Sequence, residues 1–157
     1  MTSTALPVTA VAPRPRPTAR TGTALWIFRV VSLVQATGMV LMPYLIGSFL
    51  QGHYPALKMH ATVGGLLMLL TMLELAAAAL LRWPGRLPLW PALAVLGLLV
   101  LLPTQLGLGY LREVALHVPL GVLLVAGSVA LAGWAWTPGR ARRSTLPASP
   151  ARPEVRA

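Results

Sequence analysis

Cysteine is absent from this chain, and acidic residues are nearly so. Without cysteine there can be no disulfide, thiolate metal site, iron–sulfur cluster or covalent c-type haem, so histidine is the only conventional soft ligand left. The three acids, Glu74, Glu113 and Glu154, stand against thirteen bases, which gives a net charge of +10. Because the bases flank long apolar runs, they indicate membrane topology, and we expect no nucleic-acid partner.

Charged residues are also scarce, since they make up 10% of the 157 residues against roughly 25% in soluble proteins. Hydrophobic residues make up 56%, so a lipid bilayer is the expected solvent and partner. A helix needs about 20 residues to cross a bilayer core, and four apolar segments reach that length. They predict an all-α, integral membrane, up-down-up-down four-helix bundle with helices over 25–49, 57–81, 87–110 and 114–136.

The two ends of the chain differ from its apolar middle. Residues 1–23 and 138–157 are rich in proline, threonine, alanine and arginine, so we expect disordered tails around a bundle over 24–137. Positive charges concentrate on the cytoplasmic side of membrane proteins. On the side of the tails lie Arg14, Arg16, Arg20, Arg82, Arg86, Arg140, Arg142 and Arg143, and on the other side only Lys58 and Arg112. The charges predict a multi-pass protein of the cell (inner) membrane with both termini cytoplasmic.

Two histidines, His60 and His117, fall inside predicted helices, each a few residues from the non-cytoplasmic end. Up-down topology puts their helices on a diagonal of the bundle, so we expect the two side chains to share one depth and to face each other. A glycine follows each histidine by four residues, at Gly64 and Gly121, on the same helix face. This spacing clears bulk for a porphyrin, although glycine also serves plain helix packing.

The histidines have three other interpretations. Each could hydrogen-bond across the bundle, relay protons, or lie at the headgroup interface. The third histidine, His53, falls in a loop and is expected to be solvated.

Other polar residues lie within the apolar segments. Gln105 lies near histidine depth and could donate to a haem propionate or to an imidazole, whereas Gln35 is expected to make an interhelical hydrogen bond. Glu74 falls about 40° from the face of His60 at about 100° per residue. Because Arg29 lies at a similar depth, an Arg29–Glu74 ion pair is the simplest way to hold both charges in the membrane. A proton or quinone role for Glu74 ranks second.

Three stretches resemble one four-helix half of heme A synthase, and also small bacterial four-helix membrane proteins of unknown function. They are Pro103-Thr-Gln105-Leu-Gly107, Ala115-Leu-His117-Val-Pro-Leu-Gly121 and Met59-His60-Ala-Thr-Val-Gly64-Gly65. The resemblance covers residues 24–137 and implies that His60 and His117 are axial haem ligands. This chain has four helices rather than eight and one histidine pair, so room for both a substrate haem and a cofactor haem would require a dimer.

The first functional hypothesis is therefore a membrane protein that binds haem b through His60 and His117, the predicted metal ligands, with Gly64, Gly121 and Gln105 around the cofactor. Two protein ligands fill both axial positions, which favours one-electron transfer, with a redox partner or a second copy of the chain as protein partner. The alternative is a cofactor-free accessory subunit or permease component. A soluble-type enzyme ranks third, because no nucleophile with a base, carboxylate pair or phosphate loop occurs, and no catalytic residue is predicted.

Overall fold

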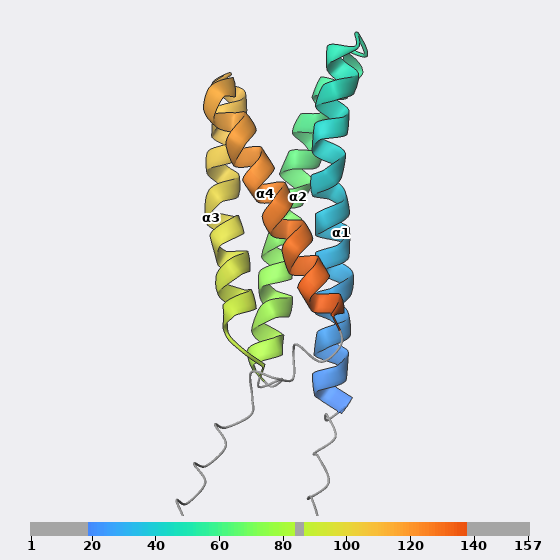
Figure 1. Cartoon of the computed structure of the whole chain (residues 1–157), viewed down its shortest axis with the longest axis vertical. Coiled ribbons are helices and arrows are strands. Elements are labelled where there is room, and N and C mark those ends of the chain that lie inside the picture. The colour runs from blue at the N-terminus through green and yellow to red at the C-terminus, as the bar shows by residue number, and fades with distance from the viewer. Residues whose placement is uncertain (1–18, 84–86, 138–157) are drawn as a thin grey trace, which may run out of the picture.

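The computed structural model of the protein describes residues 19–83 and 87–137 and is built from four antiparallel α-helices (Figure 1). In chain order these are α1 (Ala19–Leu50), α2 (Pro55–Arg82), α3 (Trp90–Tyr110) and α4 (Val114–Trp136). All four are long and apolar enough to cross a membrane. The predicted all-α four-helix bundle is confirmed, and the chain is a multi-pass membrane protein.

The helix ends follow the prolines. Helix α2 begins at Pro55, the first helical position, where a missing N–H costs nothing. Helix α3 begins at Trp90, three residues after the predicted Leu87, because Pro88 disfavours helical backbone at the residue before it. The predicted bounds of α4 are confirmed at both ends.

Helix α1 is longer than the sequence predicted. It begins at Ala19 rather than at Leu25, so the prediction of a disordered tail over 1–23 is wrong for residues 19–23. The last proline before the helix is Pro17, and no helix-breaking proline separates Ala19 from the apolar run. The rest of the predicted N-terminal tail, and the predicted tail over 138–157, lie outside the described residues.

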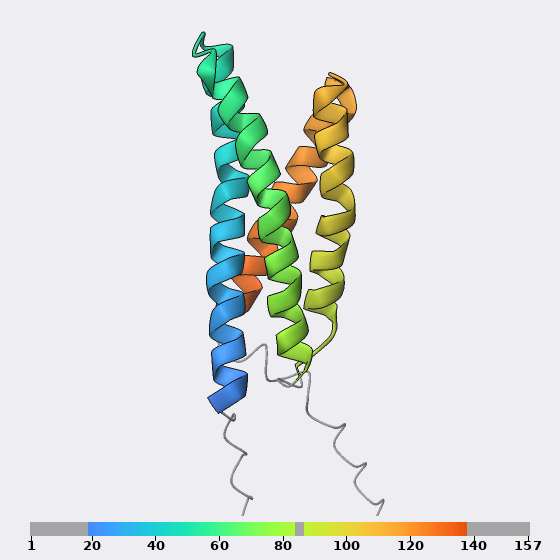
Figure 2. The same cartoon turned by 180° about the vertical axis from the view of Figure 1, so that it is seen from behind.

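The helices pack in a ring, in which α1 contacts α2 and α4, and α3 contacts α2 and α4. Helices α2 and α4 are therefore diagonal partners, as predicted. We call the end with the turns over 51–54 and 111–113 the hairpin end, and the end where α1 begins and α4 finishes the terminal end. Figures 1 and 2 show the α1–α2 hairpin and the α3–α4 hairpin diverging toward the hairpin end, while α4 crosses to α1 at the terminal end.

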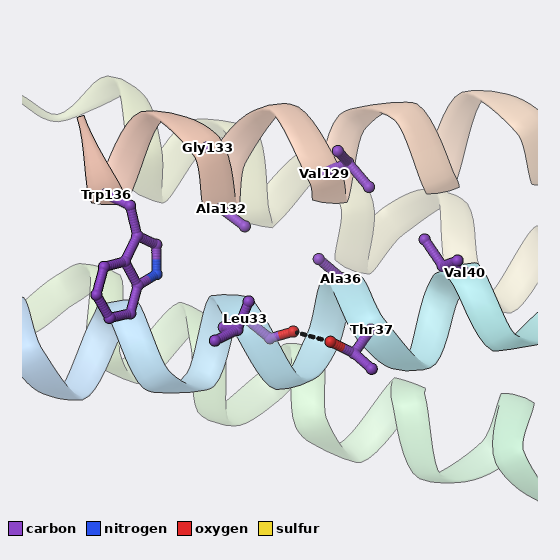
Figure 3. A pocket seen from close by; sticks show the side chains of 8 residues that line it. All are labelled: Leu33, Ala36, Thr37, Val40, Val129, Ala132, Gly133 and Trp136. Atoms are coloured by element: carbon purple, nitrogen blue, oxygen red, sulfur yellow. Dashed lines mark hydrogen bonds between the residues drawn. The ribbon is translucent and has the colours of Figure 1, made fainter.

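The outer surface of the bundle is apolar. Large side chains such as Leu73, Val100 and Val122 are more than 60% exposed, which would be costly in water and is normal for helices that face lipid. A groove between α1 and α4 also opens on this surface (Figure 3), lined by Leu33, Ala36, Thr37, Val40, Val129, Ala132, Gly133 and Trp136. The Thr37 hydroxyl donates to the Leu33 carbonyl of its own helix at 2.8 Å, so the walls are almost wholly apolar and we place no functional site there.

Candidate functional site

The two membrane histidines meet at the hairpin end of the bundle. His60 lies five residues after the start of α2, and His117 lies three residues after the start of α4. Their ring centroids are 6.2 Å apart, and the ring planes are tilted by 53°. Both side chains are half-buried. The prediction that these residues share one depth and approach each other across the bundle is confirmed.

Each imidazole is held by a backbone carbonyl of the other helix in its own hairpin. His60 Nδ1 lies 3.2 Å from the Met42 carbonyl oxygen of α1, and His117 Nδ1 lies 3.0 Å from the Gln105 carbonyl oxygen of α3. A carbonyl oxygen only accepts, so Nδ1 is the protonated nitrogen in both rings. In the neutral imidazole the lone pair then lies on Nε2. A ring nitrogen bound to a carbonyl, with the other left basic, is typical of metal-ligating histidine.

A second hydrogen bond joins Gln105 and His117. The Gln105 side-chain Nε2 donates to the His117 backbone carbonyl at 2.9 Å, while its own carbonyl accepts from the His117 ring. This reciprocal pair fixes α3 against α4 at the site. The expectation that Gln105 donates to an imidazole is therefore corrected: the donor reaches the histidine backbone. Its Oε1 is buried and has no hydrogen-bond partner.

Three glycines border these side chains. A Cβ atom on Gly109 would lie 3.0 Å from His117 Cε1, and one on Gly121 would lie 2.9 Å from Gln105 Nε2. A Cβ on Gly64 would make ordinary contact with Met42 Cε at 3.5 Å. The space beside Gly121 thus holds the Gln105 carboxamide, which corrects the expectation that this glycine leaves room for a porphyrin.

Sequence reasoning missed Gly109 and the Met42 carbonyl. Both acceptor carbonyls lie within two residues of a helix proline, since Met42 precedes Pro43 and Gln105 follows Pro103 by two positions. A helix proline removes one backbone N–H and disturbs the turn before it, and membrane helices compensate through neighbouring side chains. Met42 lies in the turn that Pro43 disturbs, whereas Gln105 lies beyond Pro103, so proline does not mark both acceptors.

The expected Arg29–Glu74 ion pair does not form among the described residues. Arg29 Nε donates to the Ala135 carbonyl at 2.8 Å, and its guanidinium carbon lies 5.7 Å and 5.4 Å from the ring centroids of Trp26 and Trp136. The carbonyls at the end of α4 carry the negative pole of the helix dipole, so they compete for the cation. Glu74 is 1% exposed and its Oε2 has no hydrogen-bond partner.

The prediction for Gln35 is confirmed, because its Nε2 donates across the α1–α2 interface to Thr71 Oγ1 at 2.7 Å. His53 is exposed in the turn between α1 and α2, beside Tyr44 and Gln51. Within residues 19–83 and 87–137, no group of three or more His, Asp or Glu side chains is placed to hold a metal ion. The histidine pair therefore offers two nitrogen ligands and no more.

Comparison with known proteins finds no matching family model, no matching curated protein and no matching solved structure.

Proposed function

We propose that the protein binds haem b through Nε2 of His60 and Nε2 of His117 and transfers single electrons within the membrane. The observation that carries this proposal is the pair of Nδ1 hydrogen bonds to backbone carbonyls, which leaves a basic Nε2 on each of two neighbouring imidazoles. A porphyrin supplies four ligands to its iron, so two protein ligands complete the coordination. When bound, haem supplies a reversible one-electron couple.

The distance between the rings supports the same ligand. Two metal–imidazole bonds of about 2.0–2.1 Å each, the length made to zinc, span about 4 Å between ligating nitrogens. The two half-rings beyond those nitrogens account for the remainder of the 6.2 Å between centroids. The separation of the ring centroids therefore suits two imidazoles bound to one metal.

The free-energy cost of unpaired polar atoms in a membrane also supports the proposed haem ligation. The Nε2 lone pair is an acceptor that a ligand can satisfy where water is scarce, and here two such nitrogens belong to neighbouring, half-buried rings. A metal between them would satisfy both lone pairs at once. Because both axial positions would then be filled by protein, electron transfer is favoured over oxygen chemistry, which needs an open position.

An absorption spectrum tests this proposal. We expect the full chain, purified in detergent from haem-replete cells, to carry about one haem per chain. The Soret band should sharpen and shift on reduction with dithionite, as expected of a six-coordinate haem. A colourless protein that does not take up added haemin would overturn the proposal and leave the cofactor-free membrane subunit as the better interpretation.

The charges flanking the helices support a proposed orientation. Arg82 lies at the terminal end, and Lys58 and Arg112 lie at the hairpin end. In the sequence, most other basic residues come before the apolar part of α1, between α2 and α3, or after α4. We therefore propose that the terminal end faces the cytoplasm across the inner membrane. His60 and His117 lie only about 4.5–7.5 Å from the starts of their helices, at a rise of 1.5 Å per residue. The haem would therefore lie near the outer side of the membrane and pass electrons to an acceptor on that side.

Single cysteines test the orientation cleanly, because the natural chain has none. Gln51→Cys places a thiol in the exposed turn at the hairpin end, and Trp83→Cys replaces an 83% exposed side chain at the terminal end. With a membrane-impermeant maleimide, we expect Gln51→Cys to react in intact cells and Trp83→Cys to react only after permeabilisation. The reverse pattern would overturn the orientation and would leave the haem proposal to its own test.

A further inference from the structure

Five polar side chains are buried together in the middle of the bundle, away from the histidines. They come from α1, α2 and α4, and each is at most 1% exposed: Ser32, Gln35, Thr71, Glu74 and Ser128. Gln35 is seven residues from Met42, or about 10 Å along the helix. The proposed haem site uses none of the five. We call this group the polar centre.

Contacts between α1 and α2 hold four members of the polar centre in one place. Gln35 donates to Thr71 at 2.7 Å, and Ser32 and Glu74 lie three residues away from these two on α1 and α2. Residues three apart share a helix face. The Ser32 hydroxyl accordingly lies close to the Glu74 carboxyl, although the two do not meet the geometry of a hydrogen bond.

The fifth member, Ser128, reaches the same level from α4. The hydrogen bond from Arg29 to the Ala135 carbonyl fixes the register of antiparallel α1 and α4. Gln35 lies six residues after Arg29, and Ser128 lies seven residues before Ala135. These two steps along antiparallel helices differ by one residue, or about 1.5 Å, so Ser128 lies at nearly the same depth as Gln35.

Four oxygen atoms of the polar centre have no hydrogen-bond partner in the described part of the chain: Ser32 Oγ, Gln35 Oε1, Glu74 Oε2 and Ser128 Oγ. A helix serine readily satisfies itself on the carbonyl four residues earlier, as the Thr71 hydroxyl does on Leu67. Neither serine does so here. Each unpartnered buried group costs about 1–3 kcal/mol, so four within one turn of helix in the middle of the bundle indicate an absent ligand.

The chemistry of these atoms defines the class of that ligand. All four are oxygens, which hard cations prefer. Glu74 supplies one negative charge, while Arg29 is engaged at the end of α4. A monovalent cation would neutralise that single charge, whereas a divalent ion would leave a net positive charge in the membrane, which is unfavourable.

We propose that the polar centre is a binding site for a monovalent metal cation, with Na⁺ as its ligand, held by the Glu74 carboxylate and the oxygens of Ser32, Gln35 and Ser128. The ion stabilises the packing of α1 and α2 against α4 in the membrane. Its site is separate from the histidines, so Na⁺ binding and haem binding are independent properties of the chain.

Thermal unfolding of the full chain in detergent tests the site with Na⁺ as the probe. At equal ionic strength we expect NaCl to raise the unfolding temperature above that in choline chloride, with saturation. A tenfold excess of Na⁺ over its dissociation constant should give a rise of about 3–6 °C. Equilibrium binding of radioactive Na⁺ should approach one ion per chain.

Glu74→Gln should lose the dependence on Na⁺, and Glu113→Gln, in the exposed turn, is the matched control that should keep it. Should Glu74→Gln fail to fold, Ser128→Ala decides, because loss of one ligand should raise the Na⁺ concentration at half-saturation about tenfold. Identical unfolding in NaCl and choline chloride would overturn the site and indicate a neutral Glu74. An unchanged Na⁺ response in Glu74→Gln or Ser128→Ala would overturn it equally.

Discussion

His60→Ala and His117→Ala are each expected to abolish the six-coordinate haem spectrum. Each substitution removes one of the two imidazoles whose rings approach across the α2–α4 diagonal, and within residues 19–83 and 87–137 the one other histidine is exposed in a turn. Loss of a ligand should reduce haem retention by more than the 10- to 100-fold typical of losing a mere supporting contact. Absorption spectra of the reduced and oxidised variants provide the measurement.

His53→Ala is the matched control for this experiment, because it removes a histidine from the same end of the molecule without touching the pair. Its spectrum should equal that of the unchanged protein. Circular dichroism should show the same helix content in all three variants, which separates a lost ligand from a lost fold. A six-coordinate spectrum that survives in His60→Ala or in His117→Ala would show that the haem iron has another ligand.

Gly109→Val is expected to weaken haem binding without altering either ligand. The new Cβ would lie 3.0 Å from His117 Cε1 and 3.3 Å from Nδ1, so the ring must move and strain its 3.0 Å hydrogen bond to the Gln105 carbonyl. Overpacking of this kind costs about 1–3 kcal/mol, which corresponds to roughly 5- to 150-fold in affinity. Haemin titration of the purified apoprotein measures the change.

Gly107→Val offers a control on the same helix, two residues away, because a Cβ at that position meets nothing within 4 Å. Both variants replace glycine by the same β-branched residue, so any general effect on α3 is shared between them. Titration curves that coincide for the two variants would mean that the position of the His117 ring does not limit haem affinity.

The sequence was sufficient to predict the bundle and the approach of its histidines. Four apolar segments of spanning length and short turns allow few arrangements, and the up-down order places α2 opposite α4. Depth follows from counting residues, so the sequence alone pairs His60 with His117. The interhelical bond of Gln35 was predictable for a related reason, since a buried amide in a membrane must find a partner.

The acceptors at the site could not be predicted in the same way. Met42 and Gln105 act through backbone carbonyls, which every residue has, so no side-chain pattern marks them. The role of Gly109 depends on the angle between α3 and α4, which a sequence does not state. Arg29 donates to a carbonyl at the end of α4 and not to Glu74. Which of these two acceptors it binds depends on how the helices cross and not on depth alone.

Neither hydrogen bond that orients an imidazole crosses between the two helical hairpins. His60 is bound to α1 and His117 to α3, so each hairpin carries one imidazole together with the carbonyl that fixes its tautomer. A cofactor at this place would be clasped by two separable modules that diverge around it (Figure 2). The same clasp could be built by two copies of a single hairpin, which makes duplication of a two-helix ancestor a sufficient origin for the site.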